Sequence, residues 1–292
     1  MTRRKFCRWL VAGSCLAFVL FVLTSWFVAG ALIASANRSV GTPPEDLPVA
    51  NATLKSESGS RIATWHIPAE NSRATIVLLH GLREDRRSML GRARLFHKAG
   101  FSIVMIDMQA HGESPGKNVT IGHLERHDVR AAVDYVRRIN PQHRIGIVGV
   151  SLGGAAALLA SPLGIDAMVL ESVYPTITEA VHNRVSKQVG SLSHVLAPVL
   201  LCQLQPRLGI TESDLRPIDH IANIECPVLI ASGDLDLHTT IAETERLFDS
   251  AVEPKQLTIF HGAAHTDLLE FDSQTYDNQI LTFLITCLSS DQ

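Results

Sequence analysis

The sequence of 292 residues lacks the patterns of the common nucleotide, redox and metal sites. Its five cysteines stand singly, without a C-x-x-C pair, which excludes the usual zinc and dithiol motifs. It has no G-x-x-x-x-G-K-S/T loop and no properly placed G-x-G-x-x-G pattern, so we expect no phosphate-binding loop and no cofactor. His123 and His127 stand four residues apart, but their order is not H-E-x-x-H. We interpret them as part of a solvated helix face.

An excess of positive charge is also missing. The formal net charge is −3, and no stripe of Lys and Arg alternates with aromatic residues, so nucleic-acid binding has no support. Hydrophobic residues make up 46% of the chain, which suits one large domain with a substantial core. We expect a ligand that is small or lipid-like.

One long stretch near the N-terminus, between Arg8 and Arg38, has no charged residue. Residues 9–36 within it exceed the roughly 20 residues that cross a bilayer, and they predict a transmembrane signal-anchor helix. The apolar core of a cleavable signal peptide is shorter, about 7–15 residues, although the small residues at 34–36 resemble a cleavage site. Basic residues precede the stretch, so residues 1–8 are predicted to be cytoplasmic, with the following domain on the periplasmic, lumenal or extracellular side.

The pattern of the remaining residues predicts a linker followed by one domain. Residues 37–49 contain three prolines and few large apolar side chains, which is typical of a linker. From residue 50 to 292, short apolar runs alternate with helical patterns, which predicts a mostly parallel sheet flanked by helices. The expected strands include residues 61–67, 74–79, 102–107, 145–148, 167–170, 227–231 and 256–260.

Residues 173–224 interrupt this alternation. They show helical periodicity without an apolar strand, and they separate two expected strands. We predict a helical cap inserted over the site.

The G-x-S-x-G pattern at residues 149–153 follows an apolar strand and precedes a helix-forming run. At such a turn Ser151 is held in a cramped backbone conformation with its hydroxyl projecting from the sheet. The helix N-terminus directs free N–H groups at a negative charge forming nearby, so the N–H of Leu152 is a candidate oxyanion donor. The N–H of Leu82, after the strand that ends in His80-Gly81, is a second one.

A serine nucleophile needs a histidine as base and a carboxylate that orients it. Both are expected at the carboxyl ends of the strands, where Ser151 emerges. Asp234 and Asp236 follow the penultimate strand, and His261 and His265 follow the last one, which gives the chain order Ser, Asp, His. Asp236 and His265 are the preferred pair, while Asp234 suits a turn-capping role.

With these motifs, residues 50–290 resemble the α/β-hydrolase superfamily, and in particular the branch of monoglyceride lipases, serine aminopeptidases and membrane-anchored α/β-hydrolase-domain proteins. The resemblance implies that Ser151 is the nucleophile, Asp236 the acid and His265 the base, with an oxyanion hole at Leu82 and Leu152. The family places the acid three residues after a glycine, here Gly233. The motifs that carry the resemblance are His80-Gly81, the loop with Asp107, Gly112 and Ser114, the G-x-S-x-G turn, Gly233-x-x-Asp236 and His265.

The resemblance also assigns structural roles around this site. His80, Asp107 and His111 are expected to shape the loops beside it rather than to react. Gln109 stands where the family commonly has arginine, a departure that affects no catalytic role.

The motifs and the N-terminal apolar stretch together predict a membrane-anchored serine hydrolase that cleaves a carboxylic ester through an acyl-enzyme intermediate. The apolar cap and the neighbouring bilayer favour a lipid or acylglycerol as this ester. A peptidase or amidase of the serine aminopeptidase type is the alternative, with Glu179 or Glu212 of the cap holding a substrate amine. A non-catalytic binding module with the same fold is the third reading, because fold alone does not establish activity.

Overall fold

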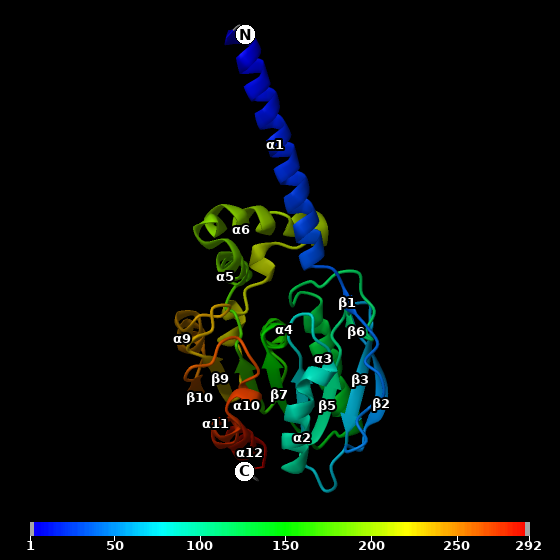
Figure 1. The fold of residues 1–292 in the computed structure, drawn as a ribbon. Helices are drawn as coiled ribbons and strands as arrows, with labels where there is room; N and C mark the ends of the chain where they lie inside the picture. The colour runs from blue at the N-terminus through cyan, green and yellow to red at the C-terminus, as the bar shows by residue number, and fades with distance from the viewer. Residues whose placement is uncertain (1–2, 290–292) are drawn as a thin grey trace.

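The computed structural model describes residues 3–289, and within the first helix it describes the side chains of Trp9 and of residues 12–32. Residues 1–2 of the predicted cytoplasmic segment 1–8, and residues 290–292 of the predicted domain 50–292, lie outside the described residues. The chain starts with helix α1 (Arg3–Leu32), which projects from the domain as one continuous rod (Figure 1). Its 21 residues Ala12–Leu32 have a mean hydropathy of 2.3, and they are long and apolar enough to cross a membrane.

The domain is built on an eight-stranded sheet in the order β10-β9-β8-β7-β4-β5-β3-β2. Neighbouring strands from β10 to β5 are parallel, and β3 pairs antiparallel with both β5 and β2. This arrangement confirms the predicted, mostly parallel sheet. The strands are β2 (Ala50–Lys55), β3 (Arg61–Ile67), β4 (Ala74–Leu79), β5 (Ser102–Ile106), β7 (Arg144–Val150), β8 (Ala167–Glu171), β9 (Val228–Gly233) and β10 (Lys255–Phe260).

The sequence pattern follows the position of each strand in the sheet. Every residue of β4 and β5 is buried, because helices cover both faces of these central strands, and their sequences are correspondingly almost unbroken apolar runs. Strand β2 lies at the edge, where most of its side chains are exposed, and its polar sequence gave no strand signal.

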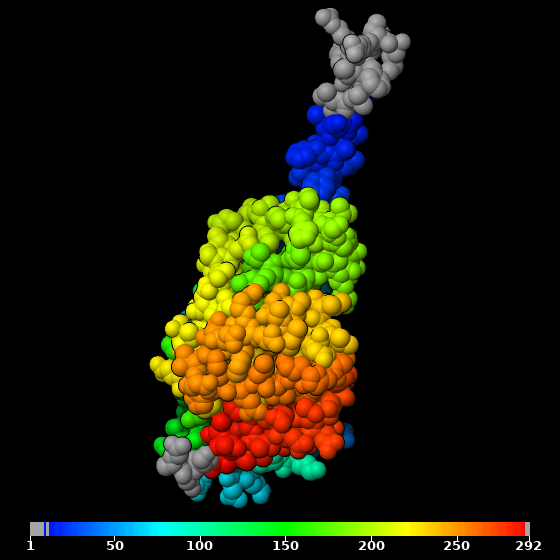
Figure 2. Space-filling view, turned by 90° about the vertical axis from the view of Figure 1, so that its left-hand side faces the viewer, coloured from blue at the N-terminus to red at the C-terminus, as the bar shows by residue number. Residues whose placement is uncertain are grey.

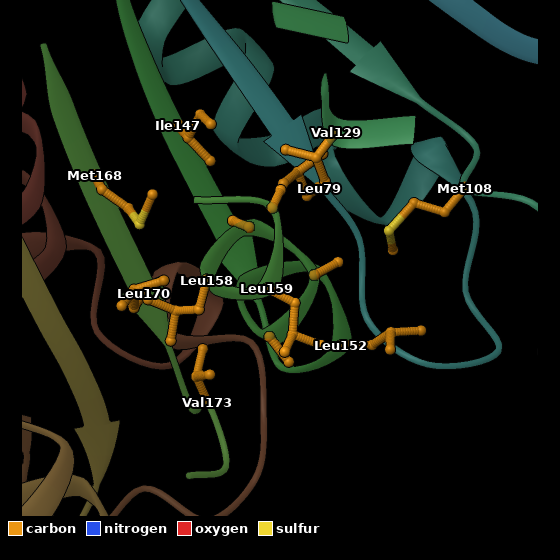
Figure 3. Packing of buried hydrophobic residues seen from close by; sticks show 14 of the residues in the cluster. Leu79, Met108, Val129, Ile147, Leu152, Leu158, Leu159, Met168, Leu170 and Val173 are labelled. Atoms are coloured by element: carbon orange, nitrogen blue, oxygen red, sulfur yellow. The ribbon is translucent and has the colours of Figure 1, made fainter. Parts of the chain in front are cut away.

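Helices pack on both faces of the sheet and divide the core into two clusters. One cluster packs α3 (Glu125–Ile139) and α4 (Leu152–Ala160) on the sheet, and Figure 3 shows Leu158 and Leu159 of α4 among these side chains. The other cluster packs α2 and the C-terminal helices. The remaining elements of the domain are η1 (Arg86–Met89), α2 (Leu90–Lys98), α9 (Ile241–Ser250), α10 (Leu268–Phe271), α11 (Ser273–Tyr276), η4 (Asp277–Leu281) and α12 (Thr282–Ser289).

Residues between β8 and β9 form helices and no strand, as the pattern over 173–224 predicts. Figure 1 shows this cap beside the base of α1 and over one end of the sheet domain, and Figure 2 shows the same cap from another side. It touches α1 directly, because the Arg207 guanidinium lies 3.8 Å from the centre of the Trp26 ring and donates to the Trp26 carbonyl. The cap elements are α5 (Ile177–Val189), η2 (Gly190–Leu192), α6 (Ser193–Leu201), α7 (Leu204–Leu208), η3 (Glu212–Asp214) and α8 (Ile218–Ile221).

The predicted linker 37–49 is fastened to the domain at its start. Strand β1 (Ala36–Asn37) pairs in parallel with β6 (His111–Gly112), and the Ala36 N–H donates to the Ala110 carbonyl at 2.7 Å. Val40 and Leu47 are buried. The composition of this segment does not predict the attachment. The attachment depends on main-chain hydrogen bonds, which any sequence can form, and not on a run of apolar side chains.

Candidate active site

Ser151 occupies the turn between β7 and α4. Its φ of 48° and ψ of −107° lie in a region that a non-glycine residue rarely adopts, and such strain is typical of functional turns. The backbone on both sides holds this conformation. The Ser151 N–H donates to the Glu171 carbonyl at 2.8 Å, and the Ser151 carbonyl accepts from the Ala155 N–H at 3.0 Å.

Glycines make this turn sterically feasible. A Cβ atom on Gly149 would lie 2.6 Å from the backbone of Gly154, and one on Gly153 would lie 2.4 Å from the Leu79 carbonyl oxygen. A Cβ atom on Gly154 would lie 2.2 Å from Cγ2 of Val173. The G-x-S-x-G motif provides two of these glycines, and the third follows it directly. The helix therefore packs against the sheet more closely than any larger residue would allow.

Asp236 and His265 come together in the structure. His265 Nδ1 donates to Asp236 Oδ2 at 2.7 Å, while Oδ1 accepts from the N–H groups of His238 at 2.7 Å and Thr239 at 3.0 Å. The Asp236 side chain is fully buried and that of His265 is 24% exposed. Burial disfavours the Asp236 charge, but the hydrogen bonds from His265 and the two N–H groups outweigh it and lower the Asp236 pKa.

Asp234 has a different partner. It accepts from His261 Nδ1 at 2.9 Å and from the Gly262 N–H at 2.7 Å, and the His261 side chain is 85% exposed. The structure therefore brings Asp236 to His265, while Asp234 caps the turn after β10, the role that its position suggested.

The three residues Ser151, Asp236 and His265 share one edge of the sheet. They follow β7, β9 and β10, whose carboxyl ends point the same way because the strands are parallel. The loop of Asp236 is also joined to the segment that follows β8, since the Thr239 hydroxyl donates to the Ser172 carbonyl at 3.2 Å.

The two expected oxyanion donors lie on neighbouring elements of this edge. Leu152 is the first residue of α4, where backbone N–H groups have no partner within the helix. Leu82 follows β4, and its loop is fixed because the Gly81 N–H donates to Glu84 Oε2 at 3.0 Å.

His80 and His111 form a neutral pair beneath this loop. His80 Nδ1 donates to the Gly81 carbonyl at 2.8 Å, and Nε2 accepts from the Met108 N–H at 3.1 Å. The two rings lie 5.0 Å apart. Burial lowers the pKa of each histidine to about 4, so both are uncharged at neutral pH. Both nitrogens of His80 are thus occupied in shaping the loop.

The Asp107 loop is held by charge. Asp107 accepts from the Arg86 backbone N–H at 2.7 Å, from the Arg86 guanidinium and from the Glu113 N–H at 2.8 Å. Gly112 has a φ of 47°, and a Cβ atom there would lie 2.2 Å from Asp107 Oδ2. The Asp107 carboxylate therefore fixes the conformation of the loop by accepting hydrogen bonds from Glu113 within it and from Arg86 beside it.

Gln109, where the family commonly has arginine, anchors the same region to α3. Its side-chain amide donates to Glu125 Oε1 at 2.6 Å and to the Asn118 carbonyl at 3.0 Å. Glu125 also accepts from Thr120 and Gly122, so it is committed to the loop rather than to the nearby histidines. Among the side chains that the structure describes, no group of three or more His, Cys, Asp or Glu is arranged to hold a metal ion.

A buried ionic network, which the sequence analysis did not predict, contacts the segments next to Ser151 and His265. Arg92 of α2 donates twice to Glu171, at 3.0 and 2.5 Å, and once to Asp267 at 2.7 Å. The Tyr276 hydroxyl donates to Glu171 at 2.6 Å. The Glu171 carbonyl holds the Ser151 N–H, and Asp267 stands two residues after His265. The network therefore joins the backbones that carry the serine and the histidine.

The chain is similar to known proteins in sequence and in fold. A family model described as serine aminopeptidase S33 matches residues 70–212. The uncharacterized protein YqkD of Bacillus subtilis is 27% identical over 236 residues, which cover 79% of this chain and 77% of YqkD. The esterase Pf2001 of Pyrococcus furiosus has a TM-score of 0.72 at 20% identity, over 88% of this chain and 100% of that chain. The α/β hydrolase GrgF of a Penicillium species has a TM-score of 0.67 at 20% identity, over 84% of this chain and 100% of that chain.

The chain has the α/β-hydrolase fold, as the sequence motifs predicted, and over residues 70–212 it is similar to the serine aminopeptidase S33 family. The match to the family model supports hydrolase activity.

Proposed function

We propose that the chain is a membrane-anchored serine hydrolase that cleaves carboxylic esters through a triad of Ser151, His265 and Asp236. The observation that carries the proposal is the buried Asp236 carboxylate bound to His265, at the sheet edge from which the strained Ser151 emerges. Asp236 keeps the His265 ring in the tautomer whose Nε2 accepts a proton.

In the proposed reaction, His265 removes the hydroxyl proton of Ser151 as its oxygen attacks the ester carbonyl. The N–H groups of Leu82 and Leu152 stabilise the oxyanion, and His265 returns the proton to the departing alcohol. Water then attacks the acyl-serine with His265 again as base, and the carboxylic acid leaves. Asp236 stabilises the imidazolium that forms in each half-reaction.

Activity-based labelling tests the triad. The full chain in detergent is treated with a fluorescent fluorophosphonate. We expect no labelling of Ser151→Ala, and labelling slowed by about 10³–10⁴-fold in Asp236→Asn because the histidine tautomer is lost. Asp234→Asn is the matched control, since Asp234 lies in the same loop and pairs with His261 instead. A folded wild-type chain that does not react would refute the triad and favour the binding-module reading.

The peptidase alternative requires a free cap carboxylate for a substrate amine. Glu179 has other partners, because it accepts from the Thr176 hydroxyl at 2.7 Å and forms an ion pair with Arg246. Glu212 accepts from the Thr178 hydroxyl at the surface. These contacts favour the ester. Rates on an aryl ester and on an amino-acid arylamide separate the two, and faster cleavage of the arylamide would overturn the ester assignment.

Two features support an anchor in the membrane. Side chains along α1 are mostly exposed although they are apolar, with Phe27 at 77%. The cap helix α6, at the base of α1, also presents apolar side chains outward at helical spacing, among them Leu192 just before it and Val195 within it. Such a face suits a lipid surface better than water.

Membrane fractionation tests the anchor. The full chain is expected to resist extraction by alkaline carbonate and to keep residues 1–36 by intact mass, whereas a signal peptide would be missing from the mature chain. Protease added outside intact cells or spheroplasts is expected to digest an extracellular or periplasmic domain and leave a tag at the N-terminus protected. Protease added outside intact organelles is expected to remove that tag and leave a lumenal domain protected. A full chain recovered in the soluble fraction would overturn the anchor.

A further inference from the structure

Hydrogen bonds from Asn183 hold the cap helix α5 against the loop next to the proposed base, His265. The Asn183 side-chain amide donates to the His238 carbonyl at 3.3 Å and to the two carboxylate oxygens of Glu243 at 2.8 and 3.0 Å. His238 stands two residues after Asp236. The face of α5 that carries Asn183 therefore looks onto the loop of the proposed acid.

His238 lies between the proposed base and the cap. Its ring centre is 4.9 Å from that of His265, with 33° between the ring planes. On the other side, Lys187 Nζ of α5 lies 3.3 Å from His238 Nε2. Burial and the positive charge of Arg184 lower the His238 pKa to about 4, so the neutral ring accepts from the Lys187 ammonium.

Arg184 lies one turn before Lys187 on α5 and is half-buried. Its guanidinium donates to the Ala180 carbonyl of its own helix at 3.2 Å, and no carboxylate in the described part of the chain forms an ion pair with it. The nearby carboxylates have other partners: Asp236 binds His265, and Glu243 binds Asn183 and the Thr240 N–H. A half-buried cation without a counter-ion is unfavourable, and an anionic ligand would relieve it.

We propose that Arg184 and Lys187 form an anion-binding subsite beside His265, and that the substrate is an ester carrying a carboxylate or phosphate group near its scissile bond. The inference rests on the proposed function and names the substrate class of that site. It also separates this chain from an aminopeptidase, whose substrate amine would be repelled by two cations. Guanidinium and ammonium groups bind carboxylate and phosphate oxygens through charge-assisted hydrogen bonds.

Matched esters test the subsite with the full chain in detergent. The first pair is the 4-nitrophenyl monoester of adipic acid and 4-nitrophenyl hexanoate, which differ by a terminal carboxylate on an acyl chain of equal length. The second pair is 1-butyrylglycerol 3-phosphate and 1-butyrylglycerol, which differ by a phosphate on the leaving group. The readout is the ratio of kcat/KM, anionic over neutral, within each pair.

We expect the wild-type ratio to exceed about tenfold in at least one pair, because one charge-assisted hydrogen bond is worth that much. In that pair, Lys187→Gln and Arg184→Gln lower the ratio, Lys187→Glu brings it to one or below, and Arg184→Lys retains most of it. The control is Arg216→Gln, an exposed cap arginine paired with Asp219, which should leave the ratio unchanged. Lys187 is exposed, so its variants remain informative even where Arg184→Gln does not fold.

The outcomes are distinguishable. If the chain reacts with fluorophosphonate and cleaves the neutral esters, but neither short pair nor a long-chain glycerol phosphate ester in vesicles shows an anionic preference, the subsite is overturned and the hydrolase stands. A preference that persists unchanged in Lys187→Glu also overturns it. If the folded chain neither reacts nor cleaves any ester, the proposed function falls and this inference falls with it. A preference shown by a long-chain glycerol phosphate ester in phosphatidylcholine vesicles, and absent from the short esters, assigns the anion to a lipid rather than to a soluble molecule.

Discussion

Replacing Arg92 by methionine tests how strongly the buried network supports the site. Arg92 and Glu171 are 2% and 1% exposed, and the substitution leaves the Glu171 carboxylate with the Tyr276 hydroxyl as its one remaining side-chain donor in the described chain. A buried charge without its counter-ion destabilises a protein by about 3–5 kcal/mol. We expect Arg92→Met to lower the free energy of unfolding by that amount.

The double variant Arg92→Met/Glu171→Gln isolates the cause. It removes the orphaned charge but keeps an oxygen that accepts from Tyr276, so about half of the lost stability should return. Denaturant unfolding of the full chain in detergent, followed by the fluorescence of buried Trp65, measures all three free energies. Fluorophosphonate labelling of Ser151 measures the effect on the site.

Two results would refute this reasoning. If the free energy of unfolding of Arg92→Met lies within about 1 kcal/mol of the wild-type value, the Glu171 carboxylate must become hydrated in the variant. A double variant no more stable than the single one would mean that lost packing, rather than the buried charge, causes the effect. Labelling at the wild-type rate in Arg92→Met would show that the network stabilises the domain without positioning the serine and histidine.

Two further predictions follow from the same structure. Gly154→Ala should lower the free energy of unfolding by about 1–3 kcal/mol and slow the labelling of Ser151, because the new Cβ would overlap Cγ2 of Val173. Adding Val173→Ala should restore part of the stability and part of the labelling rate. If neither recovers, the steric cause is wrong. The free energy of unfolding should fall by about 1.4 kcal/mol per pH unit for each of His80 and His111 as pH drops from 6.5 to 4, since the unfolded histidines bind protons that the folded ones exclude. Unfolding curves across this range measure the slope, which His80→Gln should reduce, and an equal slope in that variant would mean that other groups take up the protons.

The elements that the sequence predicted well are those where a single physical requirement controls composition. Strands β4 and β5 are covered on both faces, which demands continuous apolar runs, and the turn at Ser151 demands glycine on both sides. The edge strand β2 has no such demand, because most of its side chains meet solvent.

Contacts between distant segments could not be predicted in this way. Asp234 and Asp236 belong to one loop, and the path of the chain after β10 decides which of them meets His265. Arg92 and Glu171 are 79 positions apart, and each resembles an ordinary surface residue in its local pattern. Lys187 and His238 likewise meet because the cap folds back over the sheet edge.

The attachment of β1 to β6 has a mechanical consequence. The Ile33 carbonyl accepts from the Val119 N–H at 2.8 Å, one residue beyond the end of α1, and Ala36 binds Ala110 three residues later. Too little free chain remains for the domain to swing on a tether. In a chain anchored as proposed, tilting α1 in the bilayer would tilt the whole domain with it. The height of Ser151 above the lipid would then be set by the rigid join rather than by the length of a linker, and the enzyme would reach ester bonds at one depth only.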